Sequence, residues 1–263
     1  MKERFYERPI FEVLCYGLSP IVILVLWEAG ARLHYIDARF FPAPTDIATT
    51  LGEMIESGEL VIHTTVSLKR IFLGFLLGAV PGVLLGVTMG FYRPAKMALD
   101  PLIAAFYPIP KVALLPLIML IFGLGELSKI VVIASGVFFI CVINGMAGVR
   151  SIDQAIIEAA QSFGAKHVYM IKEVILPGST PAIFAGLRLS LGLALILIVA
   201  AEFVAAEKGL GYLIWSSWTV FYVSRMYVGL LAVAALGMIF TYVLEWVERV
   251  AFPWQATGAK RSR

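Results

Sequence analysis

The stretch EAAQSFGAKHVYMIKEVILP, residues 158–177, is polar, charged and punctuated by glycine and proline, although apolar segments precede and follow it in the chain. It forms most of the loop 150–181, the only sizeable polar loop on its side of the predicted membrane. A loop of this composition does not serve contact with lipid. We therefore expect it to dock against another protein.

Local signals predict two short helices in this loop. Asp153 can cap the first helix, and Gly164 can end or bend it, because glycine adopts positive φ angles at little cost. The second helix is expected at about 165–173, and Pro177 and Pro181 are expected to close the segment. The loop should thus be a rigid protrusion of two helices set at an angle.

Composition indicates an integral membrane protein. Of 263 residues, 60% are hydrophobic and 15% are charged, and the mean hydropathy is +0.89. Soluble domains average about 45–50% apolar and about 25% charged residues. The net charge is +3 without a long basic run, so no nucleic acid is expected as a partner.

Six apolar segments reach the length of about 20 residues that a helix needs to cross a bilayer. An all-α integral membrane fold with six transmembrane helices is expected, because backbone in lipid must satisfy its own hydrogen bonds and the alternating strands of a barrel are not seen. The segments are 11–31, 66–91, 102–123, 129–149, 182–204 and 227–247.

These spans divide the chain into four predicted parts. The first part, 1–32, is a tail with an N-terminal helix, which we interpret as retained because no small-residue cleavage site follows it. An external loop, 33–65, a five-helix core, 66–248, and a second tail, 249–263, complete the chain.

The distribution of lysine and arginine predicts the orientation. With six spans, both termini lie on the side that holds twelve of these residues, against seven on the other side. This bias favours cytoplasmic termini. Lys69 and Arg70 are exceptions on the outer side, for which snorkelling toward lipid head groups is the simplest interpretation.

The external loop is expected to carry a short helix along the outer membrane surface. A stiff, proline-rich piece ends at Pro44, and Thr45 or Asp46 can cap the helix that follows. Its apolar face is predicted to be Ile47, Leu51, Met54 and Ile55.

Prolines interrupt the third span. The span carries Pro101, Pro108, Pro110 and Pro116, which predict a break because proline removes a backbone donor, and broken backbone at membrane depth needs cover from protein or water. Lys111 lies in the same break. It either lines a solute path or snorkels or bonds a carbonyl group.

Two further polar residues lie inside apolar spans. Asn144 is either a helix-packing contact or a path residue. Glu202 must be protonated, paired or exposed to water, and it either holds the outer loop 205–225 or lines the path.

Glycines recur every four residues in the second span. This spacing lets another helix approach closely, within the chain or across a subunit interface. The positions are Gly74, Gly78, Gly82, Gly86 and Gly90.

No metal site or other cofactor is expected in this chain. Cys15 and Cys141 lie far apart in apolar runs and are interpreted as small buried hydrophobes. The histidines His34, His63 and His167 are scattered and form no ligand cluster or catalytic pair.

The polar stretch resembles the EAA motif of permease subunits of binding-protein-dependent ABC importers, E-A-A-x3-G-x9-I-x-L-P. Here Val174 stands where isoleucine is usual. Further segments are similar to the branch that includes sulfonate, taurine, nitrate and bicarbonate permeases, so the resemblance covers about residues 40–250. These segments are FPAPTDI, TTVSLKRIFLGF, LDPLIAAFYPIPKVALLPLIML, FGLGELSKI and AEFVAAEKGLGYLI.

The resemblance implies a type I ABC importer permease fold in the bacterial cytoplasmic (inner) membrane, with the EAA segment as a cytoplasmic coupling helix. The implied partners are cytosolic ABC ATPase subunits, a periplasmic or lipoprotein solute-binding protein and a second permease copy, with a homodimer expected and a heterodimer left open. The implied coupling residues are Glu158, Ala159, Ala160, Gly164, Leu176 and Pro177, and the candidate path residues are Pro108, Pro110, Lys111, Asn144 and Glu202.

The chain is not expected to be an enzyme. It has no phosphate loop of the form GxxxxGK[ST], and LSLGL at 189–193 is not an ABC signature, so ATP and Mg²⁺ are expected on the partner ATPase. The alternative is an ion-gradient-driven secondary transporter, which typically has matching interruptions in two halves. The solute is expected to be a small organic or inorganic anion such as a sulfonate, taurine, nitrate or bicarbonate, with its identity open.

Overall fold

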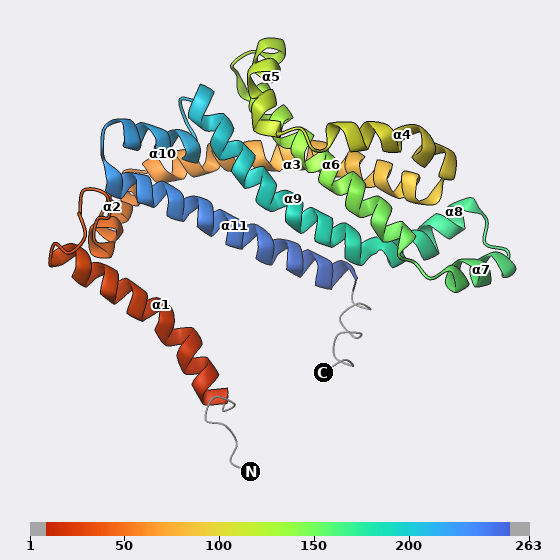
Figure 1. Ribbon diagram of the computed structural model, residues 1–263, viewed down its shortest axis with the longest axis horizontal. Helices are drawn as coiled ribbons and strands as arrows, with labels where there is room; N and C mark the ends of the chain where they lie inside the picture. The colour runs from red at the N-terminus through yellow and green to blue at the C-terminus, as the bar shows by residue number, and fades with distance from the viewer. Residues whose placement is uncertain (1–8, 253–263) are drawn as a thin grey trace. The chain divides into compact units, whose positions relative to one another are not determined.

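The computed structural model describes the backbone of residues 9–252, and the side chains from Leu18 onward except those of His167 and Ala205 (Figure 1). Over residues 9–252 the structure is all-α and contains no strand. The chain divides into a smaller unit, Met1–Val61 with Leu213–Leu231, and a larger unit, Ile62–Tyr212 with Ala232–Arg263. Each unit is described by itself.

The larger unit holds most of the helices. They are α3 (Glu59–Phe91), which begins in the smaller unit, α4 (Arg93–Phe106), η2 (Lys111–Leu114), α5 (Leu115–Phe122), α6 (Glu126–Arg150), α7 (Gln154–Ser162), α8 (His167–Met170), η3 (Ile171–Ile175), α9 (Leu176–Ala205) and most of α11 (Val223–Ala251). Its main core joins α3, α5, α6 and α9 and includes Ile71, Leu115, Ile133 and Ile198. Cys141 is part of this core, as predicted, whereas Cys15 lies outside the described side chains.

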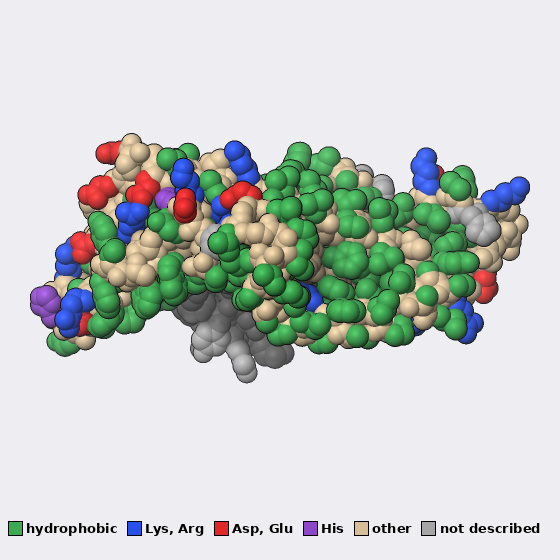
Figure 2. Space-filling model, turned by 90° about the horizontal axis from the view of Figure 1, so that it is seen from above, with side chains coloured by type: hydrophobic (Ala, Val, Ile, Leu, Met, Phe, Trp, Pro, Cys, Tyr) green, Lys and Arg blue, Asp and Glu red, His purple; other side chains and the backbone are tan. Residues whose placement is uncertain are grey.

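Four helices in the described part are long and apolar enough to cross a membrane: α3, α6, α11 and the continuous helix Val168–Val204. The bent pair formed by α4 with η2 and α5 brings the number to five if it counts as one span. On the face shown in Figure 2, hydrophobic side chains form a broad continuous area, and charged side chains gather in separate patches outside it. The first predicted span coincides with α1 (Pro9–Arg32), and the count of six spans stays a prediction.

The predicted break in the third span is confirmed. The segments Arg93–Phe106 and Lys111–Phe122 are bent by 85° (Figure 1), and Pro110 has an extended backbone conformation between them. The Lys111 side chain is buried in the break, where its ammonium donates to the carbonyl of Phe106 at 2.7 Å and lies 4.2 Å from the centre of the Phe139 ring. Lys111 therefore satisfies backbone that the prolines leave without a helical partner.

The glycine stripe of α3 packs against α6 within the same chain. A Cβ atom at Gly82 would lie 2.7 Å from the carbonyl oxygen of Phe138 and 2.8 Å from the Cβ of Cys141, and Gly74, Gly78, Gly86 and Gly90 meet α6 in the same way. Because both obstacles at Gly82 belong to rigid parts of α6, a side chain there must push the helices apart.

We expect Gly82→Ala to lower the free energy of unfolding by about 1–3 kcal/mol, as overpacking of a core does. Gly52→Ala in α2 (Pro44–Glu56) is the matched control, because nothing lies within 4 Å of a Cβ atom at Gly52 and alanine favours the helix. Thermal unfolding of both variants in detergent measures the difference. Equal melting temperatures would show that the stripe is not tightly packed.

The smaller unit contains α1, α2, α10 (Leu210–Thr219) from Leu213 onward and the start of α11. The predicted cap of α2 by Thr45 or Asp46 is wrong: the helix begins at Pro44, and the Glu28 carboxylate of α1 accepts from the Thr45 amide at 3.0 Å. The predicted face is only partly buried. Ile47 and Met54 are buried, Leu51 is half-buried and Ile55 is exposed.

The predicted end of the second loop helix is also wrong. Instead of a separate helix at 165–173, α8 leads through the π-helical turn η3 directly into α9, so Val168–Val204 is continuous. Pro177 does not stop it: the proline follows directly on the π-helical turn η3, where the Leu176 amide donates to the Ile171 carbonyl, and the helix continues through Pro177 into α9. Pro181 lies inside the helix, next to hydroxyl groups of Ser179 and Thr180 that bond carbonyls of the preceding turn.

Candidate functional site

The loop 150–181 forms a structured protrusion at one end of the larger unit. Asp153 caps α7 as predicted, since its carboxylate accepts from the Ala155 amide at 2.9 Å. Gly164 follows α7 with φ +80°, and no atom lies within 4 Å of the place where a Cβ would stand. The left-handed backbone therefore turns the chain from α7 toward α8, and the Gly164 surface is open.

Large apolar side chains point outward from this polar loop. The exposed fractions are 93% for Phe163, 79% for Val168 and 63% for Tyr169. A lone exposed apolar side chain needs no explanation, but several on one short charged loop mark a contact surface. Next to them, Glu158 and Ala159 are exposed, and Gln154 donates to the Glu158 carboxylate at 3.2 Å.

The other side of the loop is anchored. Met170 and Ile175 are buried together with Val87 of α3 and Val149 of α6, and Ala160 packs against this cluster. Leu176 is exposed and Pro177 half-buried where α9 begins. The loop is thus held by an apolar core shared with the long helices, so it cannot move independently of them.

An ionic cluster, buried except for its exposed member Glu126, lies at the opposite end of α9. We define the Glu202 cluster as Ser67, Arg70, Glu126 and Glu202. The Arg70 guanidinium, 4% exposed, pairs with the fully buried Glu202 carboxylate at 2.7 Å and makes two hydrogen bonds to Glu126, at 2.5 and 2.6 Å. Ser67 donates to Glu202 at 2.8 Å. The predicted snorkelling of Arg70 is therefore wrong, because the side chain turns inward to two carboxylates.

The Glu202 cluster fixes the backbone between α9 and α10. Glu202 accepts from the Gly211 amide at 2.8 Å, Ser67 accepts from the Leu210 amide at 2.8 Å, and Arg70 donates to the Lys208 carbonyl at 2.7 Å. His63 accepts from the Gly209 amide at 3.0 Å. Glu202 thus holds the start of the loop 205–225, one of its two predicted roles, while the other, lining the path, stays a prediction.

Asn144 takes part in the packing of α6 on α9. Its side chain donates to the Ile140 carbonyl at 2.9 Å, and a Cβ atom at Gly186 would lie 2.5 Å from the Asn144 Cβ. The packing interpretation of Asn144 therefore has direct support. The structure brings neither Asn144 nor Lys111 into the Glu202 cluster, and their place along a solute path, with Pro108 and Pro110, stays a prediction.

Sequence reasoning missed Ser67, Arg70 and Glu126 as functional candidates. Their partners are distant in the sequence, 135, 132 and 56 residues away for the contacts Ser67–Glu202, Arg70–Glu202 and Arg70–Glu126. One feature of the sequence could have identified them. They and Glu202 lie in three of the segments that resemble permeases, TTVSLKRIFLGF, FGLGELSKI and AEFVAAEKGLGYLI. No group of three or more potential metal-ligating His, Cys, Asp or Glu residues occurs in the described part of the chain.

The long apolar helices and the protruding loop are those of a helical membrane protein, and comparison with known proteins gives the family. Residues 82–252 match the model for the inner membrane component of binding-protein-dependent transport systems, and the chain belongs to this family. It is a permease subunit of an ABC importer and resides in the membrane through several spans.

Two curated relatives are similar over nearly their full length. SsuC of Bacillus subtilis (strain 168), named as an aliphatic sulfonates transport permease, is 36% identical over 90% of this chain and 86% of its own. TauC of Escherichia coli (strain K12), a taurine transport system permease, is 34% identical over 89% of this chain and 86% of its own.

A solved structure supports the fold. The chain superposes on a chain of the bacterial alginate ABC transporter, solved in complex with an alginate pentasaccharide-bound periplasmic protein, with a TM-score of 0.62. The superposition covers 95% of this chain and 99% of the other, at 16% identity, and thus shows the type I importer fold alone.

Proposed function

We propose that this permease imports a small organic anion of the sulfonate class, powered by a cytosolic ATPase that docks on the loop 150–181. In this proposal a solute-binding protein, periplasmic or lipid-anchored, delivers the anion at the end of the Glu202 cluster, and a second copy of the chain completes the pathway. ATP and Mg²⁺ bind to the ATPase and no cofactor belongs to this chain. Both termini face the cytoplasm of a bacterial cell.

The observation that carries this proposal is the combination of exposure and anchoring in the loop. Phe163, Val168 and Tyr169 offer apolar surface to a partner, while Met170 and Ile175 fasten the same loop to α3 and α6. A loop that only connected two spans would need neither feature. Because the exposed surface and the anchored side belong to the same loop, a movement of the bound partner is transmitted to the membrane helices.

The coupling residues have distinct roles in this proposal. Ala159 is small and exposed, so the partner can approach α7 closely, and the neighbouring Glu158 offers a charge at its edge. Ala160 contributes to the anchoring, and Gly164 sets the turn. Leu176 and Pro177 lie where α9 begins, inside the continuous helix Val168–Val204 that receives the movement.

The solute class rests on the relatives. Both curated relatives carry names that refer to sulfonates or taurine, and both match about nine-tenths of this chain. Taurine is itself an aminosulfonate, so the two names agree on a sulfonate group. The ion-gradient-driven transporter, our alternative from the sequence, would leave the docking loop without a purpose.

Phe163→Ser tests the docking surface. The change removes the most exposed aromatic ring of the loop. It should weaken binding of the ATPase by about 2 kcal/mol or more, as expected for an interface hot spot, which corresponds to a loss of affinity of about thirtyfold. The measurement is co-purification in detergent of the chain with its neighbouring ATPase, followed by titration of the ATPase.

The matched control is Tyr35→Ser, which removes an 84% exposed ring in the predicted external loop. It should leave the ATPase bound. If the ATPase binds both variants as it binds the unmodified chain, Phe163 is not part of the docking surface. If it does not bind the unmodified chain either, the proposed docking of this ATPase on the loop 150–181 falls.

A further inference from the structure

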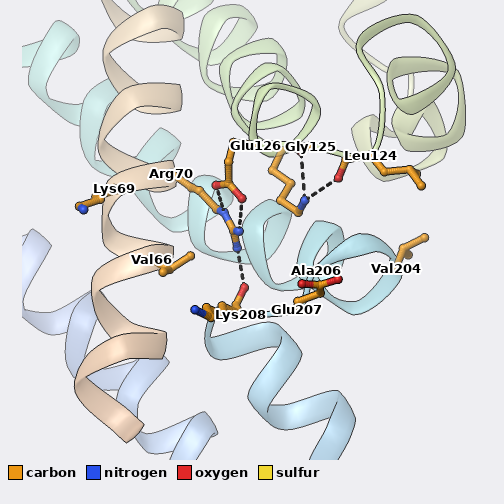
Figure 3. A pocket seen from close by; sticks show the side chains of 11 residues that line it. Val66, Lys69, Arg70, Leu124, Gly125, Glu126, Val204, Ala206, Glu207 and Lys208 are labelled. Carbon is orange, nitrogen blue, oxygen red and sulfur yellow. Dashed lines mark hydrogen bonds and ion pairs between the residues drawn. The ribbon is translucent and has the colours of Figure 1, made fainter. Parts of the chain in front are cut away.

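A charged cleft of about 700 Å³ lies beside the Glu202 cluster (Figure 3). Three parts of the larger unit line it: the start of α3, the junction of α5 with α6, and the chain after α9. Its volume falls in the range of small-molecule sites, about 300–1,000 Å³. The cleft is formed within one chain and does not depend on the anchored loop at the other end of α9.

Some of the charged side chains that line this cleft are already paired within the chain, and others are not. Arg70 lines the wall, but its guanidinium is bonded to Glu126 (Figure 3) and also to the buried Glu202. The remaining lining charges are Lys69, Lys129 and Lys208 against a single carboxylate, Glu207. The free charge of the cleft is therefore positive.

Lys129 is the decisive residue. Its side chain is only 2% exposed and lines the cleft, and its ammonium donates to the carbonyls of Leu124 and Gly125, each at 3.0 Å. Among the described residues, no carboxylate lies within ion-pair distance of it. An ammonium group has three donors, so one N–H of a nearly buried cation remains for another acceptor. The carboxylates of Glu126 and Glu202 attract this ammonium from a distance, so what an anion in the cleft would add is an acceptor for the remaining N–H.

The start of α6 adds to this field. Gly125 and Glu126 line the cleft, and the N-cap Gly125 makes no side-chain cap bond, so backbone amides of the first turn lack that partner. The N-terminus of a helix carries partial positive charge and favours anions. The Lys129 ammonium and the N-terminus of α6 thus both add positive potential to the same part of the cleft.

We propose that this cleft binds the oxyanion group of a small organic solute, with the Lys129 ammonium as its main partner and Lys208 at the rim. The inference deepens the proposed function, on which its physiological meaning rests, by placing a solute site at the outer end of the permease. A solute released by the binding protein would bind here before it enters the membrane path. The same oxyanion chemistry is also offered by the phosphate of an anionic lipid head group.

The test uses the full-length permease in nanodiscs of phosphatidylcholine, with ethanesulfonate as the probe and saturation-transfer NMR as the readout. We expect the unmodified chain to bind ethanesulfonate and Lys129→Gln to weaken binding about tenfold or more, as expected for a lost hydrogen bond to a charged group. Lys96→Gln, which removes a lysine paired with Asp100 on α4, should bind like the unmodified chain.

A second variant covers the case in which Lys129→Gln does not fold. Lys208 is exposed, and Lys208→Gln leaves its backbone carbonyl, and hence the bond to Arg70, in place. It should weaken ethanesulfonate binding by up to about fivefold, the range of an exposed ion pair. Absence of binding to the unmodified chain, or equal binding by the variants at Lys129, Lys208 and Lys96, would overturn the site.

Lipid composition separates the two sources of the oxyanion. Replacing part of the phosphatidylcholine by phosphatidylglycerol should leave ethanesulfonate binding unchanged if the cleft takes a solute. Displacement by phosphatidylglycerol would assign the cleft to a lipid head group and overturn the solute assignment. Because this readout needs no ATPase, its failure is distinguishable from a failure of the docking test on Phe163.

Discussion

Gly164→Asp is expected to abolish ATP-driven uptake while the chain still inserts and folds. The backbone at Gly164 has φ +80°, which costs an L-residue about 1–2 kcal/mol, and no atom of the chain lies within 4 Å of an added Cβ. The chain itself therefore tolerates the change at a modest cost in stability. The new carboxylate instead stands on the open surface beside Phe163, where the ATPase is proposed to dock. Uptake of a labelled sulfonate by cells that express the whole importer measures the effect.

Two companion variants separate strain from docking. Gly58→Asp introduces the same carboxylate at φ +76°, also with no atom within 4 Å, in the turn between α2 and α3, and should leave uptake nearly intact. Gly164→Asn has nearly the same size and also tolerates this backbone conformation but carries no charge, so uptake above that of Gly164→Asp would assign the loss to the carboxylate on the docking surface and not to strain. Normal uptake by Gly164→Asp would remove Gly164 from the docking surface.

Arg70→Met is expected to destabilise the larger unit by about 3–5 kcal/mol, the cost of leaving a buried charge without its partner. The Glu202 carboxylate is fully buried, and without the guanidinium it keeps only uncharged donors, among them Ser67 and the Gly211 amide. The measurement is thermal or chemical unfolding of the purified chain in detergent. A change below about 1 kcal/mol would mean that Glu202 is not held by this ion pair.

The double variant Arg70→Met/Glu202→Met identifies the cause. Removing both charges should recover at least half of the lost stability, because apolar replacements of a buried pair are often tolerated. Arg188→Met is the control on a pair outside the core: Arg188 bonds Glu248 at 3.1 Å with both side chains partly exposed, so its loss should cost less than about 1 kcal/mol. A double variant as unstable as the sum of both single variants would assign the loss to packing.

Local signals in the sequence predicted the elements well and their ends less well. Residues close together in the chain decide the spans, the break at Pro108 and Pro110 and the cap at Asp153. The structure confirms the break and the cap. The predicted stop at Pro177 failed because the π-helical turn η3 carries the chain from α8 directly into α9, and no local signal in the sequence predicts such a turn.

The Glu202 cluster lay beyond such reasoning for a different reason. A charge at the end of an apolar span has the same sequence signature whether it snorkels to lipid or turns inward to a carboxylate. Only the approach of α3, α6 and α9 decides between these, and that approach depends on close contacts such as those at Gly82 and Gly186. Periodicity shows that a glycine face exists but not which helix it meets.

The uninterrupted helix Val168–Val204 has a mechanical consequence. A rod of 37 residues is about 55 Å long, so a tilt of about 5° at one end displaces the other by about 5 Å. It carries the exposed Val168 and Tyr169 at one end and Glu202 near the other, and α6 stiffens it along its length. The third span, by contrast, is broken by an 85° bend, so its two segments can change their angle without moving as one rod. If the ATPase docks on the loop 150–181 as proposed, a small rotation that it imposes at Val168 and Tyr169 is magnified along this helix toward the Glu202 cluster.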